Sequence, residues 1–258
     1  MFFEFDDFDV RERFFAIEEK VQNLKDTLKN KSEDFNHKFQ DMCSRAYVMH
    51  DSALDGQVIS NEDIYIAFES KIRLSIFKNR IMHEIKNHRK LFQNMCLGES
   101  QAYQPKKIRY DDVVKLHCEL YENVCKRETG QFRRIIPLHG TYLHDLMEPV
   151  RIKSKLQELC KQTEHPEFKA QHPINQAVIF HTKFMRVFPF LEGSGKLGRL
   201  YMNSFLRQGG YSSAIIHGSE RQRYYESLRS GQESLREFLL DNMDSCLESQ
   251  IKYMSESA

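Results

Sequence analysis

Apolar residues recur every three or four positions along most of the chain, a spacing that places them on one face of a helix. The first stripe consists of Phe14, Ile17, Val21, Leu24 and Leu28. The second consists of Phe35, Phe39, Met42, Cys43 and Tyr47. The first stripe allows two interpretations: an amphipathic helix packed on its own domain, or a short coiled-coil seam that binds another chain.

Turn and capping residues divide this pattern into separate helices. Asp55-Gly56 predicts a turn, and Ser60 with Asp63 three residues later predicts the capped start of another helix. We expect later helices at residues 111–127, 150–162, 173–188, 197–208, 221–228 and 238–253. Between residues 130 and 149 the pattern changes, because apolar residues flank the segment 137–140 as they do in a β-hairpin. The predicted fold class is all-α with one small β-hairpin.

Length and composition agree with one large domain, or with one domain that carries a helical extension. The 258 residues are 40% hydrophobic, which is enough to bury a sizeable core. We expect an N-terminal helical region at residues 1–104, a core at 105–240, and a C-terminal helix and tail at 241–258.

Charge and hydropathy exclude several classes of partner. The 38 Lys and Arg residues nearly balance the 37 Asp and Glu residues, so no overall field favours nucleic acid or an anionic membrane. No apolar run approaches the roughly 20 residues that cross a bilayer, and residues 1–7 are unlike a secretory signal. We therefore expect a cytoplasmic protein, with export by a specialised system left open. The six cysteines fit no zinc-binding pattern and are interpreted as reduced thiols.

A glycine-rich loop before a helix is the strongest chemical signal. Gly193 and Gly195 would let backbone amides approach an anion at the start of that helix. Lys196 and Arg199 would add two cations on the same side, and Glu192 offers a hard oxygen ligand for Mg²⁺. The alternative is a turn between helices with surface cations. A dinucleotide-binding or Walker loop is excluded, because the preceding pattern is helical and the Walker residues do not match.

Residues 188–199, Phe-Pro-Phe-Leu-Glu-Gly-Ser-Gly-Lys-Leu-Gly-Arg, resemble the motif H-P-F-x-[DE]-G-N-G-R-x-x-R of the Fic family. Features on both sides agree with this resemblance. The segment 172–174 begins the helix before the motif, Gly210-Tyr211 ends the helix after it, and Gly130-Gln131-Phe132-Arg133 precedes the expected hairpin. The resemblance covers roughly residues 105–240.

The resemblance implies a helical core with a β-hairpin flap, and transfer of AMP from ATP, with Mg²⁺, to a hydroxyl of a target protein. It implies that Glu192 binds Mg²⁺. The residues implied to hold the phosphates are Gly193, Ser194, Gly195, Lys196 and Arg199. The flap residues, which would align the target as an added strand, are His139, Gly140, Thr141 and Tyr142.

The motif departs from the family at three positions. Phe188 stands where the family has the histidine that takes the proton from the attacking hydroxyl, and its loss costs about 10²–10⁴ in rate. Lys196 replaces an arginine and loses the bidentate fork, whereas Ser194 replaces asparagine and keeps a hydroxyl compatible with anion binding. His139 and His217 are the candidate substitute bases.

Many family members also carry an inhibitory helix whose glutamate pairs with the second arginine of the motif. The segment Ser52-Ala53-Leu54-Asp55-Gly56 lies where the N-terminal version of that helix would be. It has Asp in place of Glu, and its serine stands three rather than four residues before the acid. We therefore hypothesise a contact between Asp55 and Arg199, with a plain helix-ending turn as the alternative.

Three functions follow from these observations. The first is a Fic-fold protein with impaired AMP transfer, residual nucleotide binding and a role in engaging another protein. The second is an active transferase of a nucleotidyl or phosphate-containing group that uses a substitute base. The third is a helical interaction module whose loop binds nothing, with association through the first apolar stripe and a homo-oligomer left open.

Overall fold

The computed structural model describes residues 8–69, 76–98, 107–124, 129–137 and 145–256. Its first helices are α1 (Phe8–Lys29), α2 (Glu33–Leu54), α3 (Asn61–Glu69), α4 (Ile76–Phe92), the π-helical turn η1 (Gln93–Leu97) and α5 (Tyr110–Leu120). These are followed by the 3₁₀ turn η3 (Pro149–Arg151), α7 (Ile152–Gln162), α8 (Pro166–Lys169), α9 (Pro173–Val187) and α10 (Ser194–Gln208). The last are the 3₁₀ turn η4 (Gly218–Glu220), α11 (Arg221–Ser230) and α12 (Gln232–Glu256). The described part of the chain is helical without a strand, which confirms the all-α fold class.

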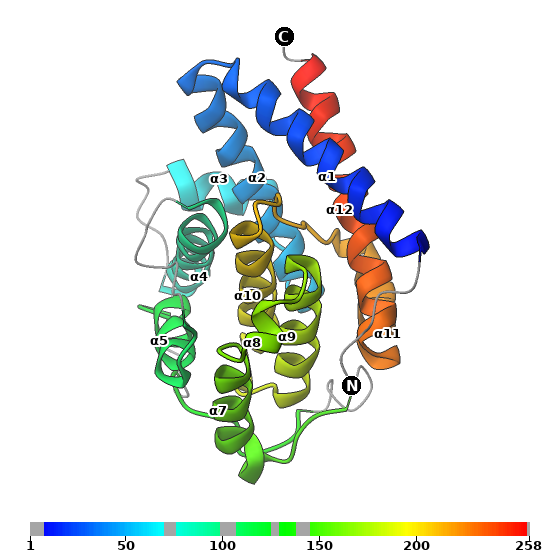
Figure 1. Ribbon diagram of the computed structural model, residues 1–258. Helices are drawn as coiled ribbons and strands as arrows, with labels where there is room; N and C mark the ends of the chain where they lie inside the picture. The colour runs from blue at the N-terminus through cyan, green and yellow to red at the C-terminus, as the bar shows by residue number, and fades with distance from the viewer. Residues whose placement is uncertain (1–7, 70–75, 99–106, 125–128, 138–144, 257–258) are drawn as a thin grey trace.

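The centre of the fold is the pair α9 and α10, which lie side by side with α4 and α5 on one flank and α11 and α12 on the other (Figure 1). Every residue of α10 from Ser194 to Leu206 is buried, including the polar ones. Aromatic rings fill the seam: Phe180 of α9 lies with its ring centroid 5.2 Å from Tyr201 and 5.3 Å from Phe205 of α10. The glycine loop thus joins two helices that are largely buried.

The first apolar stripe packs within its own chain, on α12. Its members Ile17 and Leu24 are 1% and 3% exposed, which identifies the stripe as core. Ion pairs along the flank join Arg13 to Glu237 and Lys20 to Asp244, so α1 and α12 run parallel. The interpretation as an amphipathic helix packed on its own domain is therefore right, and the stripe is not an exposed coiled-coil seam.

The C-terminal end of α2 reaches the central pair. Its last carbonyl, on Leu54, accepts a hydrogen bond of 2.8 Å from Nε of Arg221, which places a cation at the negative end of the helix dipole. Gly56 follows with φ of +83°, so the chain turns as the Asp55-Gly56 pair predicts. This docking brings the last turn of α2 over the glycine loop.

Several predicted boundaries change. The helix expected at 111–127 ends as α5 at Leu120, because Asn123, with φ of 59°, turns the chain. The capped start at Ser60 is present, with reciprocal bonds of 3.1 Å to Asp63. The boundary expected at residue 240 falls inside α12.

The expected hairpin is not seen on its described flanks, because residues 129–137 and 145–149 form no strand. The flap residues His139, Gly140, Thr141 and Tyr142 lie outside the described residues. No helix in the described ranges has the length and hydrophobicity needed to cross a bilayer.

Candidate functional site

The loop between α9 and α10 is held in a specific shape by two left-handed residues. Phe188 ends α9 with φ of 43°, and Gly193 begins α10 with φ of 78°. A side chain on Gly193 would lie 2.8 Å from the ring of Tyr121, so only glycine fits there. The hydroxyl of Ser194 closes the loop, accepting from the Phe190 amide at 2.8 Å and donating to the Phe190 carbonyl at 2.9 Å.

The bonding of Ser194 changes its expected role. Its side chain is fully buried and its hydroxyl is committed to Phe190. The hydroxyl therefore points into the loop, and the sequence-based view of it as an available anion ligand is not supported by this geometry. The nitrogen that Ser194 contributes at the start of α10 still belongs to the set of unpaired amides expected at a helix N-terminus.

Arg133 anchors the loop from the segment before the expected flap. Its Nε donates to the Phe188 carbonyl at 2.7 Å, and its terminal nitrogens donate to the carbonyls of Ile135, Met147 and Val187. The side chain is 2% exposed, so these bonds are shielded from water. Arg133 thus satisfies the carbonyls at the end of α9 and fixes the position of Phe188.

We expect Arg133→Met to destabilise the protein by about 2–4 kcal/mol, because several buried carbonyls lose a charged donor. Urea unfolding followed by circular dichroism measures this loss. Arg134→Met is the matched control, since Arg134 is exposed, and it should leave the unfolding midpoint unchanged. Equal effects of the two substitutions would contradict an anchoring role for Arg133.

His117 of α5 supports the other side of the loop. Its Nδ1 accepts from the Gly130 amide at 2.9 Å, so the ring proton sits on Nε2 and is directed at the Glu192 carbonyl, 3.1 Å away. The ring stacks on Phe190 with centroids 3.8 Å apart. The tautomer and position of His117 are thereby fixed, and its role is to orient the loop.

A cavity of about 360 Å³ opens over the loop. Its polar lining includes the acids Asp55, Glu84 and Glu192 and the bases Lys196 and Arg221. Its other side chains include those of Gln57, Tyr121, Phe188, Leu191 and Tyr225. The cavity therefore collects the position of the missing histidine, the expected Mg²⁺ ligand and one loop cation, and it holds more acids than bases.

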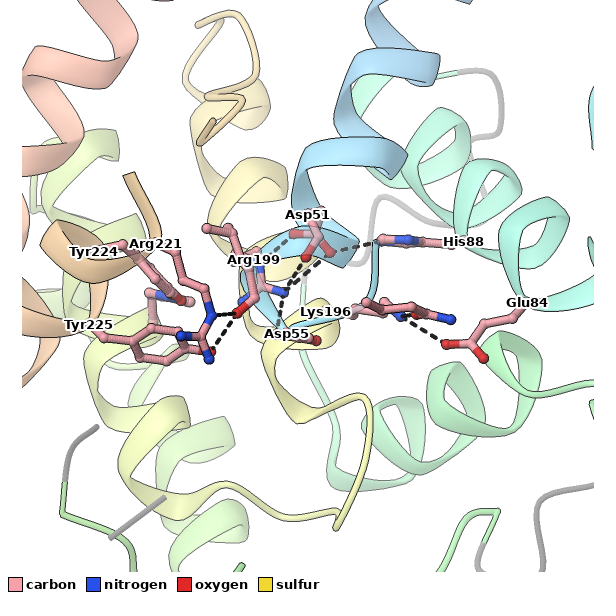
Figure 2. Close-up of polar contacts among 12 residues, drawn as sticks. Asp51, Asp55, Glu84, His88, Lys196, Arg199, Arg221, Tyr224 and Tyr225 are labelled. Atoms are coloured by element: carbon pink, nitrogen blue, oxygen red, sulfur yellow. Dashed lines mark hydrogen bonds and ion pairs between the residues drawn. The ribbon is translucent and has the colours of Figure 1, made fainter. Parts of the chain in front are cut away.

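Lys196 is already paired within the chain. Its Nζ donates to Oε1 of Glu84, from α4, at 2.8 Å and to Oε1 of Gln57 at 2.9 Å. Lys196 and Glu84 are both buried, with side-chain exposures of 4% and 9%. Figure 2 shows this pair beside the end of α2. The cation expected to hold phosphate is thus neutralised by a carboxylate of its own protein.

Arg199 is paired as well, with Asp51 of α2 and with Asp55, the residue that caps the C-terminal end of α2. Its guanidinium forms a buried ion pair with Asp51 and donates to Oδ1 of Asp55 at 2.9 Å (Figure 2). The hypothesised contact between Asp55 and Arg199 is therefore present, and Asp51 is a more deeply buried partner that the sequence did not indicate. His88 Nε2 also approaches Oδ2 of Asp51 to 3.2 Å, without hydrogen-bond geometry.

The charges of neighbouring residues determine the ionisation of Asp51 and Arg199. Burial opposes ionisation of Asp51, but the charge of Arg199 and the proximity of His88 outweigh it and hold the pKa of Asp51 well below its usual range. Burial alone would lower the pKa of Arg199, but Asp51 and Asp55 raise it well above its usual range. Asp51 and Arg199 are therefore both charged at physiological pH.

The carboxylate of Asp55 occupies the space over the start of α10. A side chain on Gly195 would lie 2.6 Å from Oδ1 of Asp55 and 2.8 Å from a terminal nitrogen of Arg199. The expected phosphate position is thus taken by an acid of the chain, which has the charge that a helix N-terminus favours. A nucleoside triphosphate would have to displace the Asp55 carboxylate from this position, and Glu192, which lines the cavity, offers an oxygen ligand of the type that Mg²⁺ takes.

Of the two candidate substitute bases only His217 is described, and it does not line the cavity. His217 lies on the outside, with its ring centroid 4.0 Å from that of His50 and Nδ1 2.6 Å from the Ser219 hydroxyl. His181 is fully buried and bonded to the Tyr224 hydroxyl at 2.8 Å. His139 lies outside the described residues. Among the described residues, no histidine lines the cavity beside Phe188.

Comparison with known proteins agrees with this arrangement of helices and loop. Residues 107–206 match the model of the Fic/DOC family. These residues form a Fic domain. The adenylyltransferase Fic of Drosophila ananassae is 30% identical over 130 residues, which is 50% of this chain and 26% of that protein. The corresponding protein of Drosophila melanogaster is 30% identical over 126 residues, 49% of this chain and 25% of that protein.

Solved structures share the fold over nearly the whole chain. Fic-1 from C. elegans has a TM-score of 0.74 and 20% identity, covering 94% of this chain and 71% of that one. A Fic domain containing signaling protein from Bacteroides thetaiotaomicron has a TM-score of 0.75 and 15% identity, covering 95% of this chain and 98% of that one. The helices outside the Fic domain are therefore part of an arrangement found in other proteins with this domain. The matched region spans about a quarter of the Drosophila relatives.

Proposed function

We propose that this chain is a Fic-fold protein related to protein adenylyltransferases in which AMP transfer is impaired, and that nucleotide competes with its own carboxylates for the glycine loop. The observation that carries the proposal is the pairing of both loop cations, Lys196 with Glu84 and Arg199 with Asp51 and Asp55. Phe188 at the base position adds to it, because a phenyl ring takes up no proton.

The competition has a physical basis. A nucleotide phosphate offers these cations the same type of contact that the carboxylates already provide, so binding exchanges one set of charge-assisted bonds for another. The apparent affinity is reduced by the fraction of molecules in which the acids have moved away. The chain then functions mainly by binding another protein. The family suggests the class of partner: a protein with a hydroxyl side chain that a transferase would modify.

Calorimetric titration with ATP and Mg²⁺ tests the competition. We expect weak binding by the wild type and at least about tenfold tighter binding by the double variant Glu84→Gln, Asp55→Asn, because a phosphate can then pair with Lys196 and replace Asp55 at Arg199. Arg199 keeps its bond to Asp51 in this variant. Glu62→Gln is the matched control, since Glu62 lies exposed on α3. Tight binding by the wild type that the double variant leaves unchanged would contradict the proposal.

A further inference from the structure

A second cavity lies away from the glycine loop, between α1, α2, η1, the end of α10 and α12. Its volume is about 420 Å³, within the range of small-molecule sites. It shares no lining residue with the cavity over the loop. Its apolar lining consists of Leu24, Leu28, Phe39, Cys43, Phe92, Cys96, Leu97, Tyr211 and Ile215. This cavity is therefore separate from the site at the glycine loop.

The described charged side chains that line this cavity are both cations. Among the described lining residues the charged side chains are Lys25 of α1 and Arg207 of α10, and no acid is among them. Lys25 is exposed and Arg207 half-buried, so the cations lie on the solvent side of an apolar interior. A side chain on Gly98 would collide with the Arg207 guanidinium, and one on Gly210 would lie 3.1 Å from Lys25 Nζ. Glycines thus leave room for both cations at the rim.

Polar atoms without partners lie in the same lining. Among the described residues, no hydrogen-bond partner reaches Ser213 Oγ, Gln250 Oε1 or Asn36 Oδ1. Ser213 and Gln250 are each only 9% exposed. The Asn36 amide nitrogen donates to the Leu28 carbonyl at 3.2 Å, which leaves its oxygen as an acceptor. Buried acceptors of this kind can take a donor from a molecule in the cavity.

We propose that this cavity binds a small amphipathic acid, with its apolar body in the interior, its carboxylate at Lys25 and Arg207, and a hydroxyl that donates to the unpaired oxygens. The apolar walls would hold the apolar body of the ligand, and the cations Lys25 and Arg207 at the rim would hold its carboxylate. The proposal is independent of nucleotide binding at the glycine loop.

Calorimetry of the full chain with 10-hydroxydecanoate, decanoate and decan-1-ol separates the parts of the proposal. We expect saturable binding of one 10-hydroxydecanoate per chain, weaker binding of decanoate, and binding of decan-1-ol weaker by about tenfold or more because the charged contact is lost. Excess ATP should leave these affinities unchanged. Absence of saturable binding would overturn the proposal and leave a cavity filled by water. Equal affinity for the acid and the alcohol would also overturn it, because the cations would then play no part in binding.

Variants locate the binding. Arg207→Gln should weaken 10-hydroxydecanoate by about tenfold and Arg207→Lys by much less, because lysine keeps the charge. Arg229→Gln on the exposed face of α11 is the matched control and should have no effect. Should Arg207→Gln lose the native circular dichroism spectrum, Lys25→Gln at the exposed rim and Cys43→Leu inside the cavity serve the same test. Unchanged affinity in folded variants of Lys25, Cys43 and Arg207 would place any bound acid elsewhere.

Discussion

Asp51→Asn is expected to lower the free energy of unfolding by about 3 kcal/mol, because the change leaves the charge of Arg199 buried with only Asp55 to balance it. Asp51 and Arg199 are 3% and 1% exposed, so water compensates little for the lost pairing. Urea unfolding at neutral pH measures the difference from the wild type. Asp34→Asn, at an exposed position of the same helix, is the matched control and should change little.

The stability lost in Asp51→Asn should depend on pH, and the sign of this dependence follows from the pKa of Asp51. Because the folded state holds the pKa of Asp51 below its usual value, ionised Asp51 stabilises the protein above about pH 4, the ordinary pKa of Asp. This contribution is lost as the pH falls from there toward the folded pKa. The stability difference between wild type and Asp51→Asn should therefore be largest near neutral pH and shrink in acid. A difference that stayed constant down to pH values near 2 would show that the lost stability is not electrostatic.

Introducing the histidine of the family motif should separate the two causes of the proposed impairment, the absent base and the paired loop cations. Phe188→His alone is expected to give little AMP transfer, because Glu84 and Asp55 still occupy the contacts of Lys196 and Arg199 that a phosphate would take. Combined with Glu84→Gln and Asp55→Asn, it should raise transfer by about 10²–10⁴ over the same double variant with Phe188. Phe188 already has a left-handed backbone, which histidine adopts more readily than a bulky apolar residue.

Transfer of labelled AMP from ATP to the protein itself, or to proteins of a lysate, measures this gain. Phe188→Gln in the same double variant is the control, since glutamine is polar and of similar length but is no general base. Equal gains with histidine and glutamine would show that a new polar group, not proton transfer, changes the activity. No gain with histidine, in a variant shown to bind ATP, would place the cause of impairment elsewhere in the cavity.

The sequence predicted some features of the glycine loop and not others. The sequence indicated the loop, its glycines and the absent histidine, because these features depend on neighbours within one short segment. It also suggested the contact of Asp55 with Arg199, which the structure contains. It could not indicate that the Ser194 hydroxyl turns inward, since that choice depends on the left-handed turn at Gly193.

The sequence by itself determined the helical character, most helix positions and the family resemblance. Helical periodicity, capping residues and motif spacing depend only on residues that are near one another in the sequence. Only the tertiary structure decided which charges meet. Glu84 pairs with Lys196 across 112 positions of the chain, and Asp51 with Arg199 across 148. Such pairs form because the docking of α2 and α4 on α10 removes water from these groups, and a buried cation is stable only beside an anion. Whether the loop is open to a phosphate or closed by a carboxylate is therefore a property of helix packing.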